Sequence, residues 1–93
     1  MYERVLRAMR SRVSSGRYVM TTHADEEMTV DGLTVFDVEH ALLSGRIVER
    51  QRDRHWGGWK YRLLGESVER EGVEVVWKMA VKGDAVIITV YRT

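Results

Sequence analysis

The chain has 93 residues, 44% of them hydrophobic and 31% charged, a composition typical of one compact domain near the lower size limit for a self-sufficient core. It contains no cysteine, which excludes a disulfide framework and any thiolate metal site. The formal net charge is +1, and no apolar run approaches the length of a membrane span or of a signal-peptide core, so we expect a single cytoplasmic domain over 1–93 with no membrane partner.

Charges are segregated along the chain. Residues 1–22 contain five arginines and one acid, residues 23–45 contain six acids and no lysine or arginine, and residues 46–62 contain six cations and two acids. Two explanations are open. Either segments of opposite charge face each other in the fold, or residues 46–62 form a surface that binds a polyanion.

Three helices are predicted in the N-terminal half. Apolar residues spaced i, i+3, i+4 and i+7 predict an amphipathic helix from Tyr2 to Ser14, and residues 17–21 form a short extended link or an edge strand. Thr22 is the expected N-cap of a second helix that runs from residue 23 to about residue 30. Thr34 is the expected N-cap of a third, which Gly45 ends with a turn.

After Gly45 the apolar period changes from 3.6 to 2, which predicts strands. Strands at about 46–54 and 59–66 flank the loop "HWGG", whose glycines can adopt positive φ, and strands at about 73–82 and 85–91 turn at Gly83-Asp84. The predicted fold class is α+β, with about three N-terminal helices packed on one face of a four-stranded antiparallel sheet.

Strand alternation predicts the two faces of this sheet. If Lys82 pairs with Ala85, one face of the second hairpin is wholly apolar and must face the helices: Val75, Trp77, Met79, Val81, Val86, Ile88 and Val90. The other face is mixed, as in a partly covered or ligand-binding surface: Glu74, Val76, Lys78, Ala80, Ile87, Thr89 and Tyr91. In the first hairpin the same logic places Arg50, Arg52 and Arg54 beside Leu63, Tyr61 and Trp59.

His23 is the candidate acid or base. It lies in the first turn of a helix, where the macrodipole disfavours an imidazolium, whereas the acids at 25–27 favour one. The alternative is a structural histidine that caps the helix or packs against the sheet edge. A metal site with His40 matches no ligand spacing, so we expect neither metal nor cofactor.

Two further groups have compositions that suit a nucleic acid. Trp56, Trp59, Tyr61 and Arg62 combine rings that stack on bases with a cation, although aromatic residues are also ordinary in strands. Lys78, Thr89 and Tyr91 fall at one end of the second hairpin. If His23 docks near that edge, a base, a cation and a phenol are close enough for phosphoryl chemistry.

The ordered motifs "THADEEM", "DGLTVFDVEHALLSGRIVER", "DRHWGGWKYRL", "GVEVVWKMAV" and "AVIITVYR" resemble a small prokaryotic family, domain of unknown function 4258, over about residues 18–92. The resemblance implies similarity to BrnT and MqsR-type toxins and to the RelE and barnase-like ribonuclease fold group. It also carries over eight motif residues: His23, Ala24, Asp37, Gly45, Trp59, Tyr61, Thr89 and Tyr91. Asp37 and Gly45 have structural explanations, a cap and a turn.

We therefore expect the toxin of a type II toxin–antitoxin pair, a metal-independent endoribonuclease whose partners are RNA and a protein antitoxin. His23 or Glu74 would deprotonate the 2′-hydroxyl, Lys78 or Arg62 would stabilise the phosphorane, and Tyr91 would orient the phosphate. The remaining candidates would bind substrate: Arg50, Arg52, Arg54, Trp59, Tyr61 and Thr89. The alternative is a non-catalytic module that binds a protein or a nucleic acid, or that forms a homodimer through a strand edge or the first helix.

Overall fold

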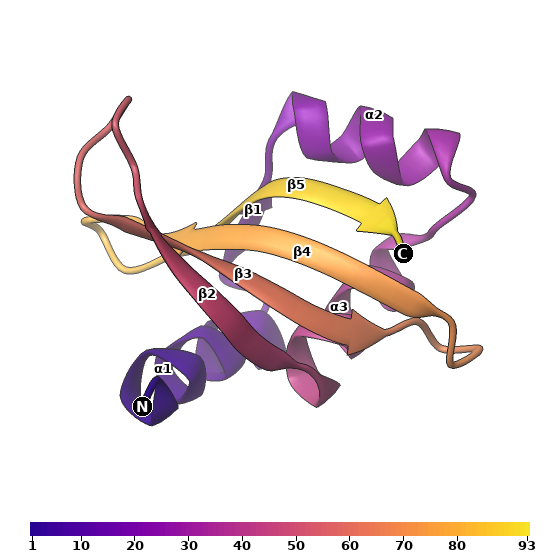
Figure 1. The fold of residues 1–93 in the computed structure, drawn as a ribbon, viewed down its shortest axis with the longest axis horizontal. Helices are drawn as coiled ribbons and strands as arrows, with labels where there is room; N and C mark the ends of the chain where they lie inside the picture. The colour runs from indigo at the N-terminus through magenta and orange to yellow at the C-terminus, as the bar shows by residue number, and fades with distance from the viewer.

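The computed structural model describes all of residues 1–93, an α+β fold of three helices and one five-stranded mixed sheet (Figure 1). None of the helices is long and apolar enough to span a bilayer. The elements follow in the order α1 (Glu3–Ser14), β1 (Tyr18–Met20), α2 (Thr22–Val30), α3 (Val35–Ser44), β2 (Arg46–Arg52), β3 (Trp59–Glu66), β4 (Gly72–Met79) and β5 (Ala85–Arg92).

The sheet has one strand more than predicted. Its order is β1-β5-β4-β3-β2, and β1 pairs parallel with β5 from Tyr18↔Ala85 to Met20↔Ile87, whereas the other pairs are antiparallel. The prediction of a four-stranded antiparallel sheet was therefore wrong. Three residues are too few for a period-2 pattern, and this strand exists because β5 offers it an edge.

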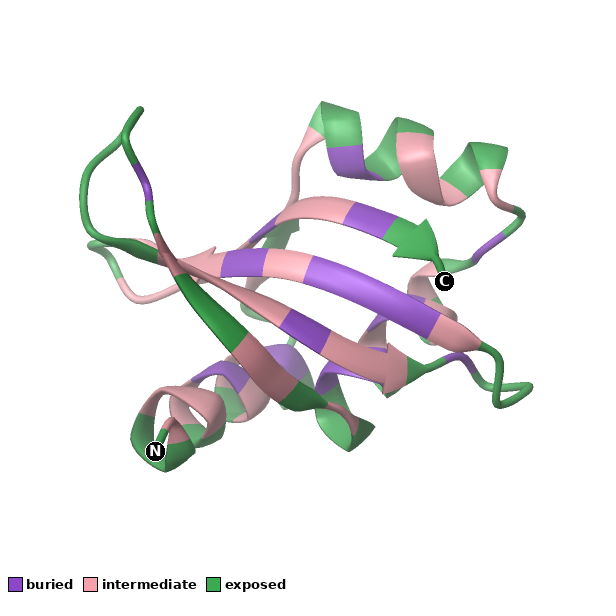
Figure 2. Ribbon diagram, in the orientation of Figure 1, coloured by how far each residue is buried: buried purple, intermediate pink, exposed green.

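The core lies between one face of the sheet and helices α1 and α3 (Figures 1 and 2). α3 packs so closely on β3 that a Cβ atom at Gly65 would clash with the carbonyl oxygen of Ala41. Gly45 has an ordinary φ of −86°, so it is needed for close approach rather than for a left-handed turn. The buried residues that carry most of the core volume are Trp77, Met9, Leu42, Leu63, Ile87, Val38, Val73, Val75 and Val90.

The β4–β5 register differs from the predicted one. Met79 pairs with Ala85 and Trp77 with Ile87, so the loop spans residues 80–84, and Val81 is fully exposed instead of facing the helices. A register shift between Val76 and Trp77 leaves Ile88 without a paired residue, which is a β-bulge. Ile87 therefore faces the core in place of Ile88.

The β2–β3 hairpin is confirmed with its register moved by two residues. Arg50 lies opposite Tyr61, Arg52 lies opposite Trp59, and Arg54 lies in the loop rather than in a strand. Gly57 and Gly58 have φ values of 81° and 73°, as the sequence predicts for this loop. A shift of two residues leaves both arginines on the same face as Tyr61 and Trp59, because side chains alternate with period 2.

The helix caps confirm one prediction and correct another. Thr34 caps α3 in a reciprocal capping box with Asp37. Thr21, not Thr22, caps α2: its Oγ1 accepts the Ala24 N–H at 3.1 Å and donates to the Ile88 carbonyl at 3.2 Å. Thr21 lies between β1 and α2, and its own N–H still donates to the Ile87 carbonyl of β5. The helix therefore begins directly after Thr21, which places the cap one residue earlier than predicted.

Candidate functional site

The face of the sheet opposite the helix-packed core carries a polar cluster of Arg62, Glu74 and Tyr91. Glu74 pairs with Tyr91 across β4 and β5, and Arg62 projects from β3 on the same face because its neighbour Leu63 points into the core. Neither α1 nor α3 covers this face, which is turned toward the viewer in Figure 1. The sheet therefore presents these three side chains from adjacent strands on an open surface.

Glu74 is a buried carboxylate on that open face, with a side chain only 7% exposed. The Arg62 guanidinium donates to its Oε1 through Nη1 at 2.9 Å, and the Tyr91 hydroxyl donates to its Oε2. Arg62 also donates through Nε to Glu49 Oε1 at 3.0 Å. The hydrogen bonds to Glu74 and Glu49 raise the pKa of Arg62, and those from Gln51 and Arg62 lower the pKa of Glu49.

His23 shares a pocket with Tyr91, one member of this cluster. A hollow of about 290 Å³ lies between α2 and the end of β5, and both His23 and Tyr91 line it. The His23 Nε2 atom lies 3.3 Å from Glu27 Oε1, and its side chain is 65% exposed. Tyr91 thus lines the pocket of His23 and donates its hydroxyl to Glu74, so it lies between these two residues.

Lys78 does not belong to the cluster of Arg62, Glu74 and Tyr91. It is four residues from Glu74 along β4, a distance of about 13 Å at the rise of a strand. Its ammonium donates to Asp53 Oδ2 at 2.6 Å and to the Gly57 carbonyl at 3.0 Å. The bond from Lys78 is the main cause that lowers the pKa of Asp53 from 3.8 to about 2. This lysine is therefore engaged in holding the β2–β3 loop, and Arg62 is the cation that contacts Glu74.

The expected substrate-binding residues divide between the two faces of the sheet. The guanidinium carbons of Arg50 and Arg52 lie 3.9 and 4.6 Å from the ring centroid of Trp59. Tyr61, on the same face by register, is stacked on the core residue Trp77 with centroids 5.0 Å apart, so its contacts are structural. Arg62 and Thr89 lie on the open face with Glu74.

Two acids that the sequence did not single out organise these regions. Glu49 holds Arg62 from the side opposite Glu74. Asp53 accepts the N–H groups of His55 and Trp56 with Oδ1, at 3.1 and 3.2 Å, in addition to its bond from Lys78. An Asp that directly precedes a glycine-containing loop is a known turn signal and could have identified this residue. Nothing in the sequence pattern pairs Glu49 with a residue 13 positions away.

No group of three or more His, Asp or Glu side chains is arranged so that it could hold a metal ion. His40 Nδ1 lies 2.9 Å from the Glu66 carbonyl oxygen, and the His55 ring packs edge-on against Trp56. The three histidines are thus each engaged with different neighbours.

Comparison with known proteins identifies the family. Residues 20–92 match the family model described as Domain of unknown function (DUF4258), so the chain belongs to that family, as its motifs indicated. Neither the curated proteins nor the solved structures that were compared with the chain gave a match. The family description names no activity, so function has to be argued from the site.

Proposed function

We propose that this member of the domain of unknown function 4258 family is a metal-independent endoribonuclease that acts in the cytoplasm as the toxin of a toxin–antitoxin pair. The observation that carries the proposal is the buried carboxylate of Glu74, held by Arg62 and Tyr91 on the open face of the sheet. Buried titratable groups with specific charge partners are concentrated at functional sites, and the core packing does not require this one. The proposal includes a fold of the RelE and barnase-like ribonuclease group.

In this reaction the proton transfers, the charge stabilisation and the orientation of the phosphate fall to four side chains. Glu74 takes the proton of the RNA 2′-hydroxyl, the 2′-oxygen bonds to phosphorus, and the bond from phosphorus to the 5′-oxygen breaks. Arg62 stabilises the negative charge of the pentacoordinate phosphorane. Protonated His23 gives its proton to the leaving 5′-oxygen, and Tyr91 orients the phosphate. The products are a 2′,3′-cyclic phosphate and a 5′-hydroxyl, and no divalent ion takes part.

Substrate would reach Arg62 by replacing a carboxylate. Arg62 bridges Glu49 and Glu74, whose side chains are 47% and 7% exposed. A phosphate approaching from solvent meets Glu49 first, so we assign Glu49 as the partner that the phosphate displaces. Glu74 then stays beside Arg62 in the position of the base.

The direct test is cleavage of single-stranded RNA in the presence of EDTA, with the new ends identified chemically. We expect cyclic-phosphate ends from the wild type and a loss of kcat of about 100-fold or more in Glu74→Gln and in His23→Ala, the usual contribution of a general base or acid. Glu66→Gln is the matched control, because Glu66 is an exposed carboxylate on β3 whose side chain makes no hydrogen bond. Thermal melts confirm folding, and His23 is exposed enough that its removal does not disturb the core.

A cellular assay tests the toxin part of the proposal. Inducible expression of the wild type in a bacterium without a cognate partner should arrest growth, whereas His23→Ala at a matched level should not. Normal growth with both, together with no cleavage in EDTA, would contradict the proposal and favour the non-catalytic interaction module.

A further inference from the structure

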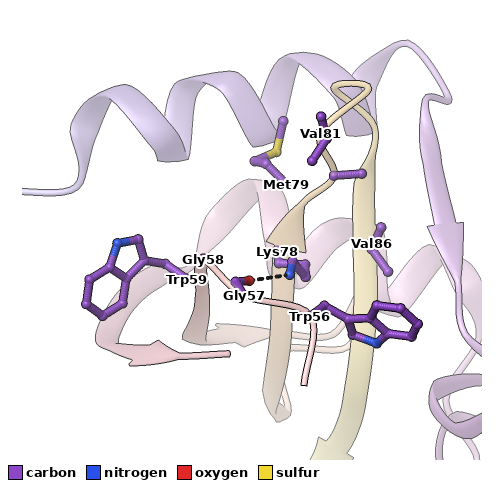
Figure 3. Close-up of a pocket in the computed structure, with 9 residues that line it drawn as sticks. Trp56, Gly57, Gly58, Trp59, Lys78, Met79, Val81 and Val86 are labelled. Atoms are coloured by element: carbon purple, nitrogen blue, oxygen red, sulfur yellow. Dashed lines mark hydrogen bonds between the residues drawn. The ribbon is translucent and has the colours of Figure 1, made fainter. Parts of the chain in front are cut away.

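A second site lies at the opposite end of the open face. The loop of residues 53–58 and the β4–β5 loop flank an open, mostly apolar pocket of about 540 Å³ (Figure 3). Its apolar lining includes Trp56, Met79, Val81 and Val86. Trp59 and the two glycines that precede it in the sequence complete the side formed by the loop. A mostly apolar lining with one cation, Lys78, is typical of a ligand-binding pocket.

The exposure of Trp56 is imposed by the loop. Its indole is 80% exposed, although an aromatic ring gains from burial. Asp53 fixes the backbone on either side: its carboxylate accepts the Trp56 N–H, its carbonyl accepts the Gly57 N–H at 2.8 Å, and Lys78 holds both the carboxylate and the Gly57 carbonyl. The ring is therefore presented at the pocket by a preorganised loop.

Cations without acidic partners surround this loop. Arg52, Arg54 and Lys60 line an adjoining hollow, and none of them forms an ion pair. Asp53 lies in the same hollow, but its charge is balanced by Lys78. Exposed aromatic rings beside unneutralised cations are the combination that binds single-stranded nucleic acid, by base stacking and by phosphate contacts. An acidic peptide satisfies the cations but leaves the apolar pocket and the exposed Trp56 ring without a matching group.

We propose that the pocket beside Trp56 binds one base of a single-stranded RNA while Arg52, Arg54 and Lys60 hold the adjoining phosphates. This inference rests on the proposed function and deepens it. The pocket and Glu74 lie about 13 Å apart along β4, estimated from the strand rise, so a short stretch of single strand connects them whereas a mononucleotide does not. The base held in the pocket thereby determines which phosphate reaches Glu74.

The test measures binding separately from cleavage. The probe is a set of short single-stranded oligoribonucleotides with 2′-O-methyl groups, which cannot be cut by attack of the 2′-oxygen, and affinity is read by fluorescence anisotropy. We expect Trp56→Ala to weaken binding about 10-fold or more, the effect of losing one base-stacking ring, and Trp56→Phe to retain most of the affinity. Phe36→Ala is the matched control, because Phe36 is an exposed aromatic residue on α3.

The outcomes separate this inference from the proposed function. Trp56-dependent binding without any cleavage of unmodified RNA supports the pocket and overturns the ribonuclease. Unchanged affinity and unchanged cleavage sites in Trp56→Ala overturn the pocket and leave the ribonuclease standing. Trp56-dependent binding of an oligoglutamate peptide with no binding of RNA also overturns the inference, in favour of an acidic protein partner.

Discussion

The two long sides of the sheet carry opposite charges and use them in different ways. At the β5 side, an acid of α2 and the C-cap residue of that helix bind the backbone: Glu27 Oε1 accepts the Val90 N–H at 3.1 Å, and Asp31 Oδ2 accepts the Arg92 N–H at 2.7 Å. At the β2 side, Arg46, Arg50 and Arg52 form no ion pair at all. Glu27 and Asp31 are thus bound to the backbone of β5, whereas these three arginines have no acidic partner.

The difference follows from the topology of the sheet. β1 pairs only with residues 85–87 of β5, so the rest of that edge needs other acceptors for its N–H groups. α2 runs beside β5 and supplies them (Figure 1). No ion pair joins the acids of 23–45 to the cations of 1–22 or 46–62, but α1 packs against α3 and Arg10 donates to the carbonyls of Leu42 and Gly45, so the basic and acidic segments of the N-terminal half do face each other. The acidic helix α2 lies against β5 and supplies hydrogen-bond acceptors to its edge.

The largest effect on stability is expected at Asp53, which holds the loop between β2 and β3. Asp53→Asn removes the partner of the half-buried Lys78 ammonium and loosens the loop, so this variant should show the greatest fall in Tm at pH 7 among those described here. In the wild type the folded pKa of Asp53, about 2, lies below its ordinary value of 3.8. Its contribution is therefore complete above pH 3.8 and is lost as the pH falls toward 2.

Thermal melts between pH 7 and pH 2 measure this linkage. Asp53→Asn should be less stable at pH 7 but should lose less stability than the wild type below pH 4. Asp25→Asn, at an exposed carboxylate of α2 without an ion-pair partner, serves as the control and should follow the wild type. Parallel losses in wild type and Asp53→Asn below pH 4 would refute the role of the Asp53–Lys78 pair.

A smaller effect is expected on the acidic side. Glu27→Ala leaves the Val90 N–H without its acceptor and should lower the free energy of unfolding by about 2 kcal/mol, the usual cost of an unsatisfied, partly buried donor. Glu27→Gln retains an acceptor oxygen and should recover most of the loss. Urea denaturation measures both, and Glu26→Ala on the exposed side of α2 should change the value by less than about 0.5 kcal/mol. Equal losses at 26 and 27 would mean that helix charge, not the edge contact, matters.

The N-cap of α2 provides the next smaller effect on stability. Thr21→Ala should lower the free energy of unfolding by about 1 kcal/mol through loss of the N-cap, and Thr22→Ala, one residue into the helix, should be nearly neutral. Urea melts of the two variants make a matched pair. The reverse order of losses would restore Thr22 as the cap.

Sequence reasoning located the elements better than their registers. The spacing and cap rules predicted the three helices and both hairpins to within a few residues, because these signals are local. The bulge at Ile88 is not local: residues beyond it, Thr89 and Tyr91, lie on the predicted open face, whereas Val86 and Ile87, before it, lie on the faces opposite to those predicted. One extra residue inverts the parity of a strand, and no composition signal marked it.

The candidate site was partly visible for the same reason. Alternation placed Glu74 and Tyr91 on one face, and the structure brings their side chains together with Arg62. The partner of Lys78 could not be found, because Asp53 lies 25 residues away in a loop whose path depends on that very contact. Such a pairing depends on the three-dimensional path of the loop, which a sequence pattern does not contain.

The smallest effects per residue should come from the cations of the basic side, and they test whether this charge binds RNA phosphates. Each phosphate contact to single-stranded RNA contributes about 0.7 to the slope of log K against log salt concentration. Replacing Arg50, Arg52 and Arg54 together by Ala should therefore lower the slope by about 2, measured with a non-cleavable oligoribonucleotide. Arg70→Ala is the control, since Arg70 is an exposed cation in the β3–β4 turn that also lacks an ion pair. An equal fall in slope per charge removed at Arg70 would mean that only net charge is sensed, whereas a fall confined to the β2–β3 hairpin would place the RNA strand along the side of the sheet whose arginines have no acidic partner.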